Sequence, residues 1–223
     1  MPSAAAYDPG GIADNFGMLT SELTSQEILL TDAITWNKTK TPNFTYDFVM
    51  QKIAHFNSVF KFDYHLCESN NTGVPVIHGL RTQYGINVTG INTSNNLRIP
   101  KTIRAGQTLD KNKTVEWVNL LRERKVIKFP AKMTPGLYEL QGELDNFGTK
   151  KLRGRTTYGA LTGHDDIVSC LITTVHFAKL RFLKFDSVKP FTFFDSDLQG
   201  DIITVLNKEF EEGKTGLHWT RVT

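Results

Sequence analysis

Strand-like and helix-like patterns follow one another in a fixed order through the first part of this chain, and that order limits the folds open to it. Three apolar segments with short connections come first, which predicts an antiparallel meander. Two amphipathic helices then alternate with two more strands, which predicts parallel crossovers. Four strands are expected at residues 3–8, 16–22, 27–36 and 86–91, and one more, which precedes the last of these, ends at Glu68. The helices are expected at 45–60 and 72–84. The sequence therefore predicts an α/β fold with a mixed five-stranded sheet flanked by helices.

The rest of the chain continues with helices and then loses its pattern. The segment Thr134-Pro135 is typical of a helix N-cap followed by proline at the first helical position. The loop at 148–163 is either a hairpin or a mobile strap. We expect a main domain over residues 1–185 and a C-terminal extension over 186–223 that packs on it or docks a partner. Further elements are expected as helices at 111–124, 134–146 and 165–184 and a short strand at 126–129.

Composition excludes some classes of protein. With 39% hydrophobic and 22% charged residues, the chain is expected to fold rather than remain disordered. It has no apolar stretch long enough to cross a membrane and no cleavable signal at its start, so we expect a cytosolic location and no membrane partner. The net charge of +3 is too small to identify a partner. Cys67 and Cys170 lie in apolar segments, which favours buried free thiols over a disulfide or a metal pair.

Three acidic sites stand at the ends of predicted elements. Asp8 ends the first strand, Glu68 ends the fourth, and Asp166 opens the last helix. The mixed sheet can bring the first and fourth strands together. Carboxylates held close repel one another unless cations lie between them, and hard divalent cations prefer oxygen ligands. The pattern indicates a divalent metal site, with Asp14 as either a secondary ligand or a residue that caps a turn.

The adjacent Asp165 and Asp166 have a structural explanation as well as a functional one. Aspartate is a favoured helix N-cap, and negative charge suits the first turn of a helix. Successive helical residues point about 100° apart, so that one can cap while the other enters the site. We expect Asp166 to be the metal ligand and Asp165 to be the cap or an outer-shell group. His164 then binds metal, phosphate or only an aspartate.

A basic segment precedes the acidic helix. Its cations would lie beside the predicted metal site, and a phosphate backbone would be attracted there. Without the acidic sites, a solvated loop would be the preferred interpretation. With them, we predict that the segment contacts a phosphate backbone and positions it without reading sequence. The cations concerned are Lys150, Lys151, Arg153 and Arg155.

Three motifs resemble those of a known family. Together they are similar to the nuclease domain of the large terminase subunit of tailed viruses, over about residues 1–182. The last motif is the most specific of the three. They are Tyr7-Asp8-Pro9-Gly10-Gly11 with Asp14 six residues after Asp8, then Glu68-Ser69-Asn70-Asn71-Thr72-Gly73, and then Thr162-Gly163-His164-Asp165-Asp166-Ile167-Val168.

The resemblance implies an RNase H-like fold, two divalent ions (Mg²⁺ or Mn²⁺) and endonucleolytic cleavage of concatemeric viral DNA during genome packaging, in the cytoplasm of the infected host cell. Asp8, Glu68 and Asp166 would be the metal-binding and catalytic residues, with Asp8 bridging both ions. Asp14, His164 and Asp165 would lie nearby. The implied partners are double-stranded DNA and a packaging ATPase domain, a portal or a small terminase subunit.

Two alternatives remain at this point. One is another RNase H-like nuclease: a junction resolvase remains open, whereas a transposase is disfavoured because its final acidic residue is usually Glu, and here Asp comes last. The other is a docking module of the packaging motor that uses the aromatic segment after Asp186. The chain has no Walker A motif, since Lys208 stands where the segment before Gly213-Lys214-Thr215 would need glycine. We therefore expect an excised or separately encoded nuclease domain.

Overall fold

The structure is a computed structural model that describes residues 1–10, 15–39, 41, 44–70, 72–94, 108–152 and 155–184. Within these ranges, Met1–Leu183 form one compact unit. The predicted C-terminal extension at 186–223 and the predicted ligand Asp14 lie outside the described residues. No described helix is both long and apolar enough to cross a lipid bilayer.

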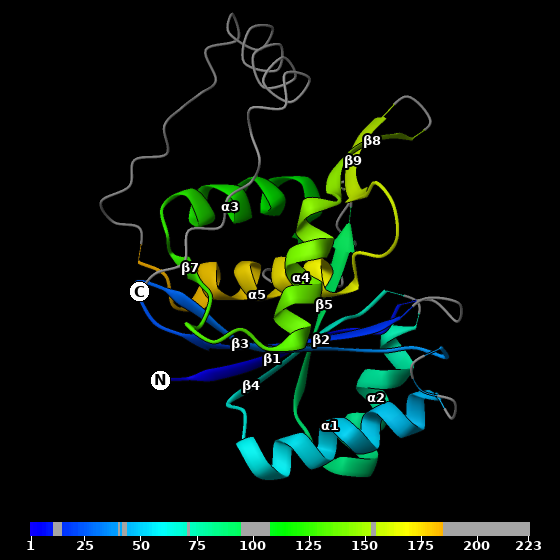
Figure 1. The fold of residues 1–223 in the computed structure, drawn as a ribbon. Coiled ribbons are helices and arrows are strands. Elements are labelled where there is room, and N and C mark those ends of the chain that lie inside the picture. The colour runs from blue at the N-terminus through cyan, green and yellow to red at the C-terminus, as the bar shows by residue number, and fades with distance from the viewer. Residues whose placement is uncertain are drawn as a thin grey trace, which may run out of the picture. The chain divides into compact units, whose positions relative to one another are not determined.

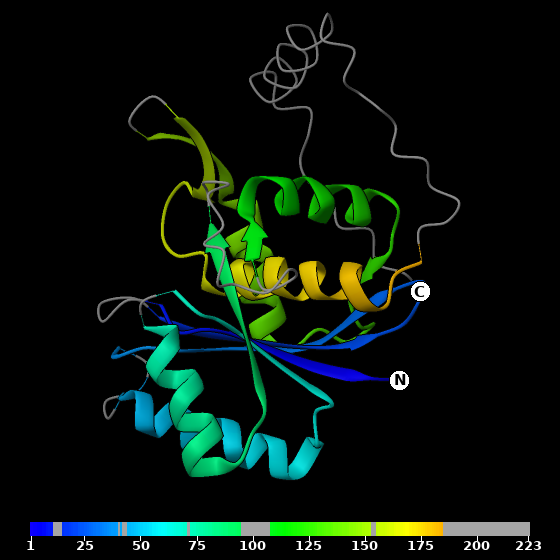
Figure 2. The same cartoon turned by 180° about the vertical axis from the view of Figure 1, so that it is seen from behind.

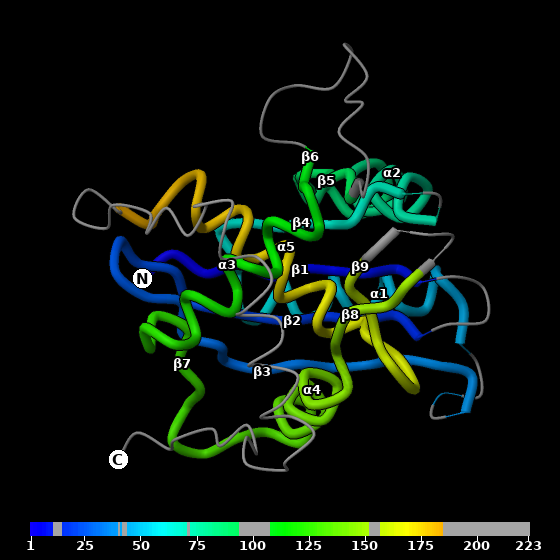
Figure 3. Tube along the Cα trace, turned by 90° about the horizontal axis from the view of Figure 1, so that it is seen from above, coloured from blue at the N-terminus to red at the C-terminus, as the bar shows by residue number. Residues whose placement is uncertain are grey.

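A mixed sheet forms the centre of the unit, with strands in the order β6-β5-β4-β1-β2-β3-β7 (Figure 3). Strand β2 runs antiparallel to both of its neighbours, and the other neighbouring pairs are parallel. The meander and the crossovers are as predicted. The strands are β1 (Ser3–Asp8), β2 (Phe16–Leu23), β3 (Ile28–Trp36), β4 (Tyr64–Glu68), β5 (Val88–Ser94), β6 (Thr108–Asp110) and β7 (Ile127–Lys128).

The sheet has seven strands where the sequence predicted five. The two additions are the edge strands β6 and β7, which are three and two residues long. Strands this short have no periodicity of their own, so their place in the sheet depends on tertiary packing. A short strand was expected at 126–129, but nothing local indicated that it would pair with β3.

Helices cover both faces of the sheet (Figures 1 and 2). On one side lie α1 (Tyr46–Phe60) and α2 (Gly73–Tyr84). On the other side α5 (Asp166–Arg181) packs on β1 and β2, α4 (Pro135–Asp145) packs on β3, and α3 (Lys111–Glu123) packs against α5. All five helices were predicted, and the largest error in their bounds is at the end of α5.

Local capping explains where three helices begin. The side chains of Thr45, Asp110 and Thr134 accept hydrogen bonds from the backbone amides of the third residue beyond each. Pro135 stands at the first turn of α4, as predicted, where its missing N–H costs nothing.

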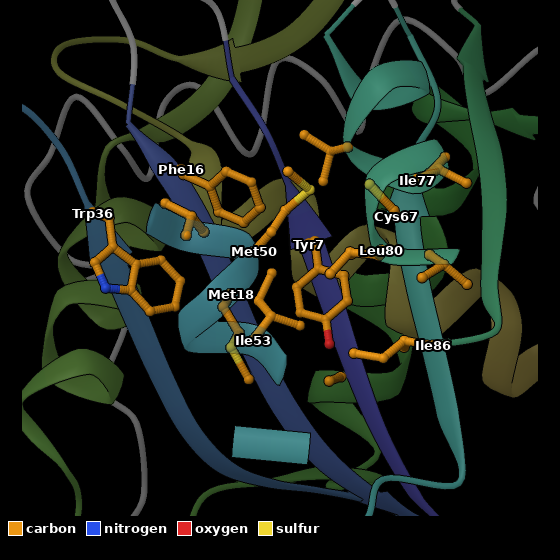
Figure 4. Packing of buried hydrophobic residues seen from close by; sticks show 14 residues of the cluster. Tyr7, Phe16, Met18, Trp36, Met50, Ile53, Cys67, Ile77, Leu80 and Ile86 are labelled. Atoms are coloured by element: carbon orange, nitrogen blue, oxygen red, sulfur yellow. The ribbon is translucent and has the colours of Figure 1, made fainter. Parts of the chain in front are cut away.

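A buried apolar cluster fills the space between the sheet and the α1–α2 layer (Figure 4). Tyr7 from β1 and Phe16 from β2 contribute aromatic rings, and Met50 and Ile53 come from the inner side of α1. Cys67 belongs to this cluster, and Cys170 is buried within α5. Both cysteines are free thiols, as predicted.

A two-stranded hairpin projects away from the sheet on the α3–α5 side (Figures 1 and 2). It consists of β8 (Phe147–Leu152) and β9 (Arg155–Ala160). At its base the rings of Phe147 and Tyr158 stack at 6.4 Å between centroids. Of the two alternatives for the loop at 148–163, the structure therefore has the hairpin.

A buried histidine links the sheet to α1. His65 is 5% exposed, its Nδ1 lies 2.6 Å from the Tyr7 hydroxyl, and its Nε2 lies 3.0 Å from Oδ1 of Asn57. The Asn57 oxygen can only accept, so Nε2 of the neutral ring donates to it and Nδ1 accepts from the tyrosine. A neutral imidazole therefore satisfies both neighbours.

Acid is expected to destabilise the fold through this histidine. Burial lowers the pKa of His65 from 6.5 to about 4. Between these values the unfolded chain binds more protons than the folded one. The contribution to the free energy of unfolding is thus complete above pH 6.5 and is lost as the pH falls to about 4, by ~3 kcal/mol in total. Urea unfolding at a series of pH values would measure it.

The variant His65→Gln removes the titrating group, so its stability should depend less on pH over this range than that of the wild type. The matched control is His55→Gln, which removes an exposed histidine of α1. Equal pH dependence in His65→Gln and the wild type would show that His65 does not cause the acid sensitivity.

Candidate active site

Two acidic residues lie side by side at one edge of the sheet. Strands β1 and β4 are parallel neighbours in which Tyr7 pairs with Cys67, so Asp8 and Glu68 follow at the carboxyl ends of both strands. Oδ1 of Asp8 accepts a hydrogen bond from the Gly10 amide at 3.0 Å. Oε1 of Glu68 accepts one from Asn70 at 2.7 Å. The structure thus brings together two of the three residues predicted to form the metal-binding triad.

The first turn of α5 lies over the same edge. Gly17 of β2 pairs with Asp8, and a Cβ at Gly17 would stand 2.8 Å from the carbonyl oxygen of Asp166 and 3.1 Å from its Cβ. The absent side chain lets the helix approach the sheet beside Asp8. Ser169, one turn into α5, also acts on Asp8: burial raises the pKa of the Asp8 carboxyl, and Ser169 lowers it in part. The start of α5 and the end of β1 therefore make one site.

The two aspartates at the start of α5 have different surroundings. Asp165 is at the N-cap position but makes no capping hydrogen bond with its side chain, and its Oδ2 lies 3.4 Å from Nζ of Lys111. Asp166 is 6% exposed, and its Oδ2 lies 3.7 Å from Nδ1 of His164. Of the two roles predicted for Asp165, the cap is absent. Burial raises the pKa of the Asp8 carboxyl, and the negative charge of Asp165 raises it further.

The helix start is capped instead by a residue that sequence reasoning missed. Oε2 of Glu143, from α4, accepts hydrogen bonds from the amides of Ile167 at 2.9 Å and Val168 at 3.0 Å. Capping rules are local, and Glu143 precedes these amides by more than twenty residues. No signal in the sequence indicated this contact.

Lys111 is the second residue that the sequence did not reveal. It opens α3 directly after β6, and its ammonium reaches Asp165 and lies 5.7 Å from the centroid of the Phe147 ring. Burial raises the pKa values of Asp8 and Glu68, and the positive charge of Lys111 offsets part of that rise. Its place at the site depends on the pairing of β6 with β5, which periodicity could not predict.

The positive charge near the carboxylates of Asp8 and Glu68 does not balance their negative charge and burial. Burial and then the charge of Asp8 raise the pKa of Glu68 to about 7. Burial also raises the pKa of Asp8. The carboxylates supply oxygen donors, the ligand type that Mg²⁺ and Mn²⁺ prefer, so their chemistry fits a divalent cation. Among the described residues, no three His, Cys, Asp or Glu side chains are grouped closely enough to hold a metal ion.

The predicted DNA-binding segment lies on the hairpin. Lys150 and Lys151 are exposed on β8. Arg153 is outside the described residues, and at Arg155 only the backbone is described. A Cβ at Gly159 of β9 would stand 3.7 Å from Oδ2 of Asp165 and 3.9 Å from Cδ of Lys150. The base of the hairpin therefore adjoins the acidic site.

No family model matches the sequence, and no curated protein matches it either. Solved structures do match. The large terminase from a thermophilic bacteriophage superposes with a TM-score of 0.56 at 13% identity, over 78% of this chain and 39% of that one. The large terminase nuclease from the thermophilic phage G20c gives 0.55 at 17% identity, over 81% of this chain and 82% of that one. The Mn-soaked human cytomegalovirus terminase nuclease domain gives 0.53 at 14% identity, over 79% and 83%.

These likenesses confirm the predicted resemblance and the predicted fold. The chain has the RNase H-like architecture of large terminase nuclease domains, with a mixed sheet between two layers of helices. It spans 39% of the length of the first of these proteins, the bacteriophage large terminase.

Proposed function

We propose that this chain is a metal-dependent DNA endonuclease of a viral genome-packaging machine. The observation that carries the proposal is the meeting of Asp8, Glu68 and the acidic first turn of α5 at one edge of the sheet. The likeness to terminase nuclease domains from phages and from cytomegalovirus supports it at the level of the fold. Cutting concatemeric DNA in the infected cell is the corresponding biological role.

The residues that would hold two divalent ions are Asp8, Glu68 and an aspartate of the Asp165-Asp166 pair. Mn²⁺ is supported by the Mn-soaked cytomegalovirus domain, and Mg²⁺ has the same preference for oxygen ligands. When bound, the ions would polarise the scissile phosphate and lower the pKa of the attacking water. Asn70 orients the carboxylate of Glu68, the Gly10 amide orients that of Asp8, and Lys111 partly offsets their charge.

The exposed cations of the hairpin would hold the DNA backbone beside the acidic site. Lys150 and Lys151 carry no information about base sequence if they contact phosphates only. A packaging ATPase domain is the partner we propose, because the longer bacteriophage large terminase also has structures with ADP and ATP-gamma-S. A portal or a small subunit is the partner proposed for residues 186–223.

Incubation of supercoiled plasmid with the purified chain tests the function. We expect nicked and linear products with Mn²⁺ or Mg²⁺ and intact plasmid with EDTA. Absence of cleavage with either metal, or equal cleavage in EDTA, would contradict the proposal. A four-way junction that is cut symmetrically while linear duplex is spared would indicate a resolvase instead.

Removal of the hairpin cations is expected to weaken binding to duplexes of every sequence alike. Each lost phosphate contact should reduce the slope of log affinity against log salt by about 0.9. We expect the double variant Lys150→Gln/Lys151→Gln to lower that slope by roughly 2 and to leave Mn²⁺ affinity nearly unchanged. Fluorescence anisotropy over a range of salt concentrations measures it.

The matched control removes two exposed cations from α1 and its C-cap, on the other side of the sheet, in Lys52→Gln/Lys61→Gln. This control should keep the wild-type slope. If both double variants keep that slope, the hairpin does not contact the phosphate backbone.

A further inference from the structure

The start of α5 is held by a carboxylate from another helix. The first amides of a helix have no partner within it, and a side chain at the N-cap position normally provides one. Asp165 occupies that position and does not cap. Oε2 of Glu143 accepts from both Ile167 and Val168 in its place.

This arrangement has a cost that local capping would avoid. Glu143 is 8% exposed, and burial raises its pKa to about 7. A buried carboxylate is unfavourable unless its hydrogen bonds and nearby dipoles compensate, which the two amides and the positive end of α5 do in part. The advantage is that the carboxylate of Asp165 is not used as the helix cap. A capping Asp165 would turn its carboxylate onto its own helix, away from Lys111 and Asp8.

The helix that carries Glu143 is itself fixed to the sheet. Oγ1 of Thr134 donates to Oδ1 of Asp32 at 2.5 Å, and Oγ1 of Thr35 donates to Oε1 of Glu139 at 2.8 Å. Both contacts join α4 to β3. Glu143 therefore ties the acidic first turn of α5 to a helix anchored on the sheet.

We propose that Glu143 is a positioning residue for the acidic site: it caps α5 in place of Asp165 and so leaves that aspartate free to face Asp8 and the metal ions. The proposal rests on the proposed metal-dependent function. Glu143 acts through the helix start and does not touch DNA or the reacting atoms.

Two conservative variants separate position from charge. Both hydrogen bonds go to one oxygen, so the amide oxygen of Glu143→Gln can replace it without a charge. Glu143→Asp keeps the charge but is one methylene shorter and draws the oxygen back from the amides. The control is Thr45→Ala, which removes the cap of α1 on the other side of the sheet. It should lower the melting temperature about as much as Glu143→Asp does.

Two readouts are measured for each protein. Amide hydrogen exchange of Ile167 and Val168 in the metal-free protein reports the cap, and calorimetric titration with Mn²⁺ reports the site. We expect faster exchange and about tenfold weaker Mn²⁺ binding in Glu143→Asp, the size of effect typical of residues that orient metal ligands. Glu143→Gln should resemble the wild type in both, and Thr45→Ala should lower the melting temperature without changing Mn²⁺ affinity.

Wild-type Mn²⁺ affinity in Glu143→Asp, with the two amides exchanging faster, would overturn the proposal and leave Glu143 as a structural cap. Weaker Mn²⁺ binding in Glu143→Gln together with wild-type binding in Glu143→Asp would overturn it as well, because charge would then matter and position would not. If the wild type binds no Mn²⁺ and cuts no DNA, the proposed function itself fails, and the positioning role with it. Normal binding and cutting by the wild type separates the first two outcomes from that failure.

Discussion

Asp8→Ala is expected to reduce plasmid cleavage by a hundredfold or more while the protein remains folded. Asp8 ends β1, where it lies beside both Glu68 and the first turn of α5. Asp8 would hold the cations that stabilise the charge developing at the phosphate, and loss of such stabilisation typically costs about a hundred- to a thousandfold in rate. The initial rate of loss of supercoiled plasmid in Mn²⁺ is the measurement.

The matched control is Asp47→Ala, which removes an exposed aspartate from the first turn of α1 on the other side of the sheet. It should cut at close to the wild-type rate. Similar cleavage rates for Asp8→Ala and the wild type would show that the acidic site formed by Asp8, Glu68 and the start of α5 is not the nuclease site.

The stability of the metal-free variant provides an independent check. Burial raises the pKa of Asp8, and the charge of Asp8 in turn raises the pKa of Glu68. The Asp8 carboxylate is therefore unfavourable where it lies, and its removal relieves repulsion. We expect Asp8→Ala to unfold at a temperature no lower than the wild type, which separates loss of chemistry from loss of fold.

Sequence patterns were sufficient wherever structure depends on neighbours along the chain. The start of α4 follows from Thr134 and Pro135, and the spacing of Val49, Ile53 and Phe56 predicted α1. The parallel placement of β1 and β4, and hence the meeting of Asp8 with Glu68, follows from the order of strands and helices. The helix positions follow from local propensities, and the placement of the strands follows because this order of strands and helices allows few topologies.

The parts that could not be predicted depend on contacts between distant elements. Lys111 reaches the site because a three-residue strand pairs at the sheet edge, and Glu143 reaches it because α4 is anchored on β3. Neither residue differs in its local sequence from an ordinary surface lysine or helical glutamate. Asp165 looked like a cap for the same reason, since the competing cap is supplied by another helix.

Substitution of Gly73 is expected to have the second large effect, because α2 can lie against the end of β4, which carries Glu68, only if residue 73 has no side chain. It opens α2, is buried, and its amide donates to the carbonyl of Asn70 at 2.8 Å. A Cβ there would overlap the carbonyl oxygen of Glu68 and stand 2.7 Å from the carbonyl carbon. Backbone atoms cannot rotate away as a side chain can. Any substituent must therefore displace either the first turn of α2 or the end of β4.

Gly73→Ala is accordingly expected to lower the free energy of unfolding by about 3 kcal/mol. The melting temperature would fall by roughly 10 °C. Cleavage should fall further than unfolding alone explains, because the displaced backbone carries Glu68. The control is Gly142→Ala, which lies within α4 and would have no heavy atom within 4 Å of the new Cβ. Alanine has the higher helix propensity, so this control should gain about 1 kcal/mol. If Gly73→Ala is as stable and as active as Gly142→Ala, α2 does not rest on the end of β4, and the position of Glu68 does not depend on a glycine there.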